Sequence, residues 1–595
     1  MKKGFIIKSK PPNLTTSQPH NLKTSQPQNL ITSQPHNLTI MNMLKYKIAT
    51  CMAVLSIAPS WAQMDNVIDV EHVYKPEIVD ANKVNVLPEV KDVPVKHYKV
   101  DYAKNILPVN SYSFTPVATD GEVQTTPVHK RFVTLGGGTE GNLLGRAAVG
   151  FDIDDKQSLD FGVGLSGNNA DVAHYGGEGD DWTSRFYSTT ASAKYKYRIG
   201  QASSLQIGAS YESQVFNYQP EYMTGAWNDP STDKQHNSIV GISAMLTPYS
   251  FGDLSVGAKV RYDMFSQKYV TNLADKYSEG VLDAEVTLGY RLNSSNWFDV
   301  CVDVTNASYS TDGVDGYTNL AVRPHYYWKG DNMDVKVGLY AGSLGIAPDI
   351  SFAYHASPKF DVYADVTGGE GLRNTFSAIS RLNPYWALYP DFSSVDSEKL
   401  ELKSQFNQLS ARAGVKFCPM EGLDVDFNTG YELSKDRLEM AIGSDSHPNM
   451  YVPVFLADGN RFFVNLNAGY SYKDILTVRL ANQFNAWTID DGNVLGAEEV
   501  LWRPVLDLDW SASVQVINGL RVGVGYRMQT FKEGEGMDYS RPTTSNLNAN
   551  VSYTFQDMPL TVYVKGDNLL NSDYDRYFGY AAPGINVIGG VAISF

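Results

Sequence analysis

The chain has 595 residues, is rich in aromatic residues (37 Tyr and 25 Phe), and carries a formal net charge of −16 with a mean hydropathy of −0.27. A negative charge of this size argues against nucleic acid as a partner. No segment after residue 62 approaches the ~20 continuous apolar residues that a membrane-spanning helix needs, which argues against a helical membrane protein.

The first 42 residues form a polar eight-residue repeat, with Asn-Leu starting at 13, 21, 29 and 37 and Thr-Ser-Gln-Pro at 16–19, 24–27 and 32–35. This tract is too short and too polar to build a solenoid. We expect translation to start at Met41 or Met43, so that 1–42 is not part of the cellular protein; the alternative is a disordered N-terminal extension.

A secretory signal peptide is predicted over 43–62. Two lysines precede an apolar core from Ile48 to Ala58, and Ser60 and Ala62 are the small residues at positions −3 and −1 before a cleavage site at Gln63. Cys51 lies in the apolar core, and lipidation there is the alternative to plain cleavage. After cleavage only Cys301 and Cys418 remain, far apart in sequence, so no disulfide framework is indicated.

Residues 63–130 are predicted to form a short extended periplasmic segment. Prolines interrupt it repeatedly, at 76, 88, 94, 108 and 116, and it shows no repeated strand-and-turn pattern. A folded domain is therefore not expected there.

From residue 131 the chain repeats one unit: about 9 to 15 residues that alternate between apolar and polar, a turn, and a return strand. Examples are Leu159–Leu165, Phe298–Val304, Phe462–Tyr472, Leu520–Met528 and Leu547–Phe555. A soluble barrel or sandwich can alternate in the same way. Runs of this length, however, exceed the usual ~5 to 6 residues of soluble strands and match the ~9 to 11 that cross a bilayer.

We predict an all-β fold for 131–595: a transmembrane antiparallel β-barrel of about 22 strands. Short turns, such as Asp154-Asp155-Lys156, are assigned to the periplasm. The longer polar stretches are assigned to the cell exterior; these are 168–183, 219–235, 307–317, 386–402, 439–459 and 489–499. The lumen of so large a barrel is too wide for wall side chains to fill.

Near the C-terminus an Asn-Leu-x-Asn-x-x-Tyr segment and a Pro-Gly precede the last predicted strand; these residues are Asn568, Leu569, Asn571, Tyr574, Pro583 and Gly584. This stretch resembles the C-terminus of TonB-dependent receptors of the outer membrane, in which the same two features precede the last strand. The last strand ends at Phe595, and a terminal aromatic residue is the usual signal to the barrel assembly machinery. Ile585 departs from the family, which commonly has Arg at that position.

The resemblance implies an outer-membrane location, contact with outer-membrane lipid and lipopolysaccharide, and TonB or another envelope protein as a partner. Val67, Ile68 and Val70 resemble the strand through which such receptors contact TonB. The family also carries an N-terminal plug of well over a hundred residues, for which 63–130 is too short. The chain is therefore closer to plug-less barrels of the Bacteroidetes type.

No catalytic, cofactor or metal site is predicted. The histidines form no H-x-x-x-H pair, and the sequence contains no Gly-x-Ser-x-Gly motif and no cysteine cluster. Arg479, Arg521 and Arg527 fall on the inferred luminal face, where they either steer anions or pair with luminal carboxylates. We expect a barrel that takes part in transport of a solute across the outer membrane; the alternative is a non-transporting scaffold that anchors other envelope proteins.

Overall fold

The computed structural model describes residues 131–173, 181–200, 203–219, 234–268, 276–311, 314–388, 400–441, 452–473, 475–490, 499–533 and 541–595. The expected leader (1–42), signal peptide (43–62) and periplasmic segment (63–130), including Val67, Ile68 and Val70, lie outside the described residues.

The described chain is a closed antiparallel barrel of 22 strands, which confirms the predicted fold class and strand number. The first half of the ring consists of β1 (Arg131–Gly138), β2 (Leu143–Asp152), β3 (Gln157–Val172), β4 (Trp182–Ile199), β5 (Ser203–Phe216), β6 (Gln235–Phe251), β7 (Leu254–Lys268), β8 (Lys276–Arg291), β9 (Asn296–Tyr309), β11 (Tyr317–Lys329) and β12 (Met333–Gly342). The second half consists of β13 (Gly345–Ser357), β14 (Phe360–Glu370), β17 (Phe406–Met420), β18 (Leu423–Met440), β19 (Val452–Tyr472), β20 (Leu476–Ile489), β21 (Leu506–Ile517), β22 (Leu520–Thr530), β23 (Thr544–Thr554), β24 (Leu560–Asp567) and β27 (Asn586–Ser594).

In the described part of the chain, six short elements lie in the connections between wall strands. They are β10 (Val314–Asp315), α2 (Phe376–Leu382), β15 (Trp386–Leu388), β16 (Leu400–Glu401) and the hairpin of β25 (Asp575–Tyr577) and β26 (Tyr580–Ala581). No helix among the described residues is long and apolar enough to cross a membrane.

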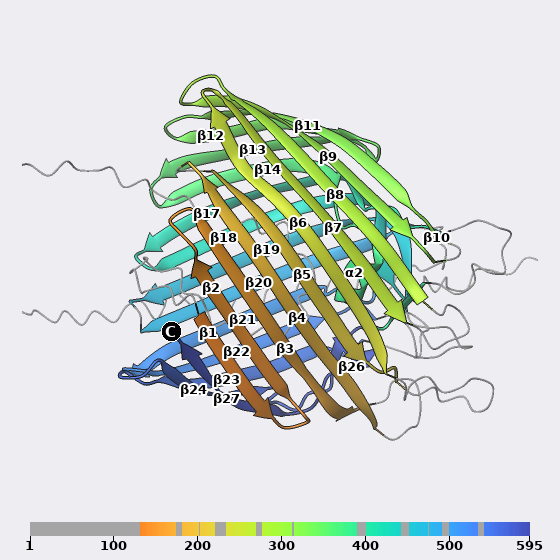
Figure 1. Cartoon of the computed structure of the whole chain (residues 1–595), viewed down its shortest axis with the longest axis vertical. Helices are drawn as coiled ribbons and strands as arrows, with labels where there is room; N and C mark the ends of the chain where they lie inside the picture. Colours follow the sequence, from red (N-terminus) through yellow and green to blue (C-terminus); the bar gives the residue numbers. More distant parts are fainter. Residues whose placement is uncertain are drawn as a thin grey trace, which may run out of the picture. The chain divides into compact units, whose positions relative to one another are not determined.

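The ring closes between its first and last strands. β1 pairs with β27 in antiparallel register, with Val133 opposite Ile593, and the backbone N–H of Phe595 donates to the carbonyl oxygen of Arg131 at 2.9 Å. In Figure 1 the tilted strands wrap round the barrel from β1, in orange, to β27, in dark blue. Because every wall strand is paired on both sides, the sheet has no exposed edge.

The two faces of the wall differ as the alternation predicts. Large apolar side chains are exposed on the outer face, for example Val163 (57% exposed), Ile242 (57%) and Leu288 (58%). The residues between them, such as Asp160, Ser243 and Glu285, point to the lumen with Gly, Ser and charged neighbours. An apolar band on the outer face is the surface that a barrel presents to lipid.

The two ends of the barrel also differ. Short turns join strands at the end where β27 finishes, called here the turn end; examples are 153–156, 252–253 and 421–422. Connections at the opposite end, called here the loop end, include the long segments 371–405 and 568–585. Several strands are longer than predicted: β3 runs to Val172, and β19 begins at Val452 and has 21 residues. The expectation that 168–172 and 452–459 belong to loops was therefore wrong.

Candidate functional site

One connection, between β14 and β17, folds into the loop end of the barrel. Its described part, residues 371–388, contains α2 and β15 and is called here the mouth strap. In Figure 1 α2 is seen toward the end opposite the C-terminus. The strap does not replace any part of the wall, because β14 pairs directly with β17, with Phe360 opposite Phe417.

The sequence of the strap explains its short helix. Thr375 is the N-cap residue, and its hydroxyl accepts a hydrogen bond from the backbone N–H of Ala378 at 3.3 Å. Phe376, Ile379 and Leu382 recur at a spacing of three residues on one side of α2 and are all buried. Asn383, followed by Pro384, ends the helix.

A carboxylate of the wall holds the start of α2. Glu279, in β8, is 5% exposed and accepts hydrogen bonds from the hydroxyl of Ser377 at 2.7 Å and its backbone N–H at 3.2 Å, and from the backbone N–H of Phe376. Burial disfavours the ionised form of this carboxyl group, and the three donors facing it oppose that effect. On the exposed side of the helix, Arg381 forms an ion pair with Glu212 of β5 at 2.9 Å.

Contacts of aromatic side chains hold the strap in place across the mouth. Tyr385 is 2% exposed; its ring packs edge-on against Phe216 of β5 at 5.1 Å, and its carbonyl oxygen accepts from the backbone N–H of Val452 in β19 at 2.9 Å. Ten strands separate β5 from β19 in either direction round the ring, β6 to β18 one way and β20 to β4 the other. One residue therefore contacts opposite sides of the barrel wall.

The neighbouring contacts complete this crossing. Trp386 is fully buried and stacks on Tyr277 of β8 at 5.1 Å, while β15 pairs in parallel with Val452–Val454 of β19. From the last connection, Tyr580 stacks on Tyr385 with ring centroids 3.5 Å apart. These side chains belong to one buried hydrophobic cluster, to which β3 to β8, β18 to β20 and the last connection all contribute. Burial raises the pKa of Tyr385, so its hydroxyl stays neutral at physiological pH.

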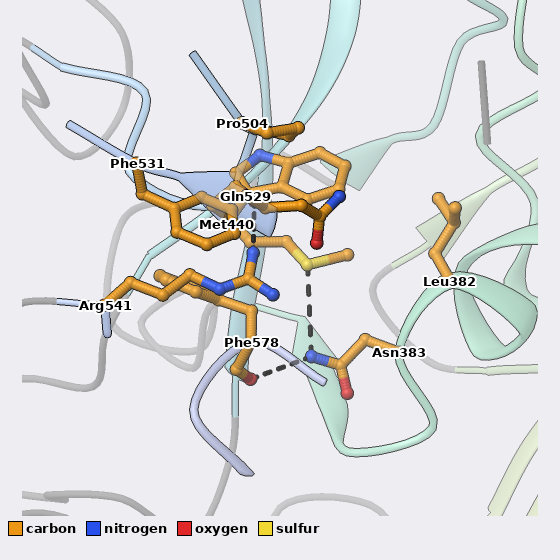
Figure 2. A pocket seen from close by; sticks show the side chains of 9 residues that line it. Leu382, Asn383, Met440, Pro504, Gln529, Phe531, Arg541 and Phe578 are labelled. Atoms are coloured by element: carbon orange, nitrogen blue, oxygen red, sulfur yellow. Dashed lines mark hydrogen bonds between the residues drawn. The ribbon is translucent and has the colours of Figure 1, made fainter. Parts of the chain in front are cut away.

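A small pocket remains beside the strap, shown in Figure 2. Asn383 points toward the sulfur of Met440 and donates to the carbonyl oxygen of Phe578 at 3.1 Å. The guanidinium of Arg541 lies over the ring of Phe531 at 3.9 Å and also donates to the carbonyl oxygen of Trp502. Asn383 therefore links the strap to β18 and to the connection after β24, while Arg541 joins the connections after β20 and β22.

Buried charges brace the wall next to this pocket. Glu439 forms ion pairs with Arg437 and, at 3.4 Å, with Arg503, and accepts from the indole N–H of Trp502 at 2.7 Å. Burial lowers the pKa of Arg503 to about 10, with the Glu439 carboxylate opposing the shift, so this side chain remains protonated at neutral pH.

Below the strap the luminal face carries paired charges. Arg323 forms ion pairs with Asp303 at 2.6 Å and Glu285 at 3.6 Å, and also contacts the thiol of Cys301 at 3.3 Å. Glu285, Cys301 and Asp303 are close enough to share a metal ion, but the arginine already lies against all three. This arrangement is explained by charge pairing without an ion.

The three arginines singled out from the sequence lie on separate parts of one wall sector. Arg527 pairs with Asp507 at 3.0 Å, Arg521 donates to the hydroxyl of Ser513 at 3.2 Å, and Arg479 lies in β20 opposite Ser511 of β21. They are not brought together into one cluster. The sequence left two interpretations open for these arginines, anion steering and pairing with luminal carboxylates. Arg527 pairs with a luminal carboxylate.

The motif residues near the C-terminus build the last connection. Asn568 is fully buried with φ of +48°, donates to the carbonyl oxygens of Ser572 and Pro583, both at 2.9 Å, and accepts from the backbone N–H of Ser572 at 2.9 Å. The amide oxygen of Asn571 accepts from the backbone N–H of Ile585 at 3.1 Å, which follows Gly584. The backbone N–H of Leu569 donates to the carbonyl oxygen of Leu547 in β23 at 2.8 Å.

This connection also anchors the aromatic cluster. The hydroxyl of Tyr574, which is 2% exposed, accepts from Asn546 of β23 at 3.0 Å. The connection then leads into the β25–β26 hairpin, which carries Tyr577 and Tyr580 into the mouth. The motif therefore has a structural role in holding the loop that contacts the strap.

Sequence reasoning missed the strap. It assigned 386–402 to an outer loop and predicted no helix, although Thr375 followed by apolar residues at 376, 379 and 382 and then Asn383-Pro384 is a recognisable helix signal. The inward fold of the segment had no local signal, because it depends on partners from β5, β8 and β19.

Comparison with known proteins identifies the fold. No protein-family profile and no curated protein matches the sequence. Solved structures do match: the pyoverdine outer membrane receptor FpvA of Pseudomonas aeruginosa bound to pyoverdine (12% identity, TM-score 0.56, 78% of each chain covered), and the copper transporter OprC (12%, TM-score 0.57, 78% of this chain and 81% of that one). The FrpB iron transporter of Neisseria meningitidis matches similarly (10%, TM-score 0.59, 78% and 81%). The barrel has the fold of TonB-dependent receptors.

The match to these structures covers 78% of the chain, and residues 131–595 make up the same share of it. At 10 to 12% identity the match shows the fold of a TonB-dependent-receptor barrel and does not identify a ligand of this protein. The resemblance inferred from the last ~35 residues is thereby confirmed at the level of fold, over a much longer part of the chain than the motif covers.

Proposed function

We propose that this protein is an outer-membrane barrel that takes part in moving a solute across that membrane through its lumen. The observation that supports this most is the combination of an apolar outer face with a polar, charged luminal face over a closed ring of 22 strands. A ring of this size encloses more space than wall side chains fill. The three solved structures named above include a receptor and two transporters, which agrees with transport.

In this proposal the turn end faces the periplasm and the loop end faces the cell exterior. Arg479, Arg521 and Arg527 contribute to the luminal charge that a solute meets, Phe595 serves barrel assembly, and lipid and lipopolysaccharide surround the outer face. TonB, or another envelope protein, is the proposed periplasmic partner, and Val67, Ile68 and Val70 its proposed contact. No catalytic step is assigned to the protein.

A scaffold role is the second candidate, and one observation favours it. The mouth strap and its partners form a buried hydrophobic cluster of the kind found in a protein interior, with Phe376, Ile379 and Trp386 fully buried. A barrel that never opens would use such a cluster as a permanent closure and would act only by anchoring other proteins.

Deletion of the gene in its native bacterium separates the two candidates. Transport predicts reduced accumulation of at least one class in a panel of labelled solutes (sugars, peptides, metal chelates), restored by the intact gene. The scaffold role predicts unchanged accumulation and the loss of specific partners from the outer-membrane fraction, measured by quantitative mass spectrometry. Unchanged accumulation across the panel would contradict the transport proposal.

A further inference from the structure

We propose that the mouth strap, residues 371–388, is an autoinhibitory segment: it shuts the outer mouth in the state described here and has to detach before anything passes through the lumen. This inference rests on the proposed transport function and adds its regulation. It concerns described residues of the β14–β17 connection only.

The ring of wall strands closes without the strap. β14 pairs with β17 along Phe360–Glu370, so the hydrogen-bonded ring is continuous behind the strap. The strap's own contribution to the sheet is the three-residue pairing of β15 with β19. Removal of the strap from the mouth therefore breaks no pairing between wall strands.

The strap is held on opposite sides of the ring. Glu279 of β8 holds the start of α2, and the backbone N–H of Val452 in β19 donates to the carbonyl oxygen of Tyr385 near the far end. A segment attached on both sides of an opening occupies the path between them. All of these attachments are hydrogen bonds, ring contacts and ion pairs, and none is covalent.

The strap begins with a stem, Gly371 and Leu372, about which the rest of the strap can turn. The backbone N–H of Gly371 donates to the carbonyl oxygen of Gln405 at 2.7 Å, and the N–H of Gln405 donates to that of Leu372 at 2.8 Å, so the stem is tied to the start of β17. Just before it, Gly369 has φ of +115°, a conformation that other residues rarely adopt. The fully buried Asn374 extends this stem, because its side chain donates to the carbonyl oxygens of Lys403 and Asp436. The stem can therefore stay in place while the residues after 374 move.

Opening of the strap costs free energy, and this cost allows the strap to act as a regulator. Detachment exposes the large buried side chains of Phe376, Ile379, Leu382, Tyr385 and Trp386 to water. The closed state is therefore strongly favoured until another molecule binds the open state better than the closed one. A ligand that reaches the loop end from outside and binds the open strap would act in this way.

Single-channel recording in planar bilayers with potassium chloride tests the proposal on the mature chain, residues 63–595. The intact protein is expected to show no steady conductance. A variant in which 376–388 are replaced by a Gly-Ser sequence of equal length is expected to show large, steady steps. A second variant, Glu279→Gln with Tyr385→Ser, keeps the length of the strap, changes only one of its residues, and is expected to open intermittently.

A matched control is Leu570→Ser, which changes a half-exposed residue of the last connection and is expected to stay silent. All variants are first checked for folding by the gel-mobility shift between heated and unheated samples. Steady conductance of the intact protein overturns the proposal, and so does silence of the folded replacement variant. The transport proposal fails independently: a conducting replacement variant together with unchanged solute accumulation in the deletion strain would leave the strap as the closure of a scaffold.

Discussion

Substitution of Glu279 by Gln is predicted to loosen the mouth strap without disturbing the barrel wall. Glu279 is almost fully buried and receives three hydrogen bonds from Phe376 and Ser377 at the start of α2. Gln has nearly the same size but keeps only one acceptor oxygen, and its NH₂ group faces backbone N–H donors. Since a hydrogen bond to a charged group contributes about 1.5–3 kcal/mol, the loss should be about 2–3 kcal/mol.

This loss corresponds to a roughly 30- to 150-fold increase in the fraction of open strap, because about 1.4 kcal/mol changes an equilibrium tenfold. Hydrogen–deuterium exchange followed by mass spectrometry at pH 8 measures it: amides of 376–388 should exchange faster by that factor, and amides of β7, β8 and β9 should not change. The control Glu212→Gln removes only the partly exposed partner of Arg381. A surface ion pair contributes about 1 kcal/mol at most, so exchange should rise less than about fivefold. Unchanged exchange in Glu279→Gln would refute the role given to this carboxylate.

Three further predictions concern the connections at the two ends of the barrel. Asn568→Ala removes three side-chain hydrogen bonds from a fully buried position, and should lower the free energy of unfolding by about 2–4 kcal/mol in urea titrations of the detergent-solubilised barrel. Gly422→Ala places a Cβ 2.1 Å from the carbonyl oxygen of Ser471 at φ of +78°, and should lower the temperature of the gel-mobility transition, with a cost on the order of 2–3 kcal/mol. The backbone N–H of Lys156 lowers the pKa of Asp154 below its ordinary 3.8, so the stabilisation of this turn should be present above pH ~4 and lost as pH falls through the lowered pKa. Urea midpoints of Asp154→Ala and the intact protein should therefore differ more at pH 6 than at pH 2.5.

Each of these predictions has a matched comparison. Leu570→Ala changes an exposed neighbour of Asn568 and should alter unfolding by less than about 0.5 kcal/mol. Gly200→Ala has a similar positive φ of +68° but no atom within 4 Å of the new Cβ, so it should be tolerated better than Gly422→Ala. Equal effects in the two glycine variants would contradict the argument from close approach, and a pH-independent gap for Asp154→Ala would contradict the argument from ionisation.

The wall of the barrel could be predicted from the sequence because its determinants are local. Runs such as Phe462–Tyr472 alternate strictly, and each strand needs only its own pattern to place one face on lipid and the other in the lumen. The ends of the strands were less predictable. β19 begins at Val452, ten residues before the clear alternation, because its first residues, among them Val454 and Phe455, are buried in the cluster at the mouth instead of facing lipid.

The strap could not be predicted, for a physical reason. Residues such as Tyr385 and Trp386 look locally like ordinary aromatic residues of a loop, and their burial arises only from contacts with Phe216, Tyr277 and Tyr580. These partners are up to about two hundred residues away in sequence. Similarly, the alternation placed Arg527 on the luminal face, but its partner Asp507 follows from strand register, which was not assigned.

Cross-linking across the mouth tests most directly whether residues 371–388 lie in the barrel opening. Cysteines are placed at 381 and 212, whose present side chains meet at 2.9 Å, in a chain with Cys301 and Cys418 replaced by Ser, and a short bis-maleimide is added to intact outer membranes. A second pair at 171 and 183, on the neighbouring strands β3 and β4, reports that the barrel is folded and reachable. We predict efficient cross-links in both pairs; a cross-link in the second pair with none between 381 and 212 would contradict the inward position of the strap.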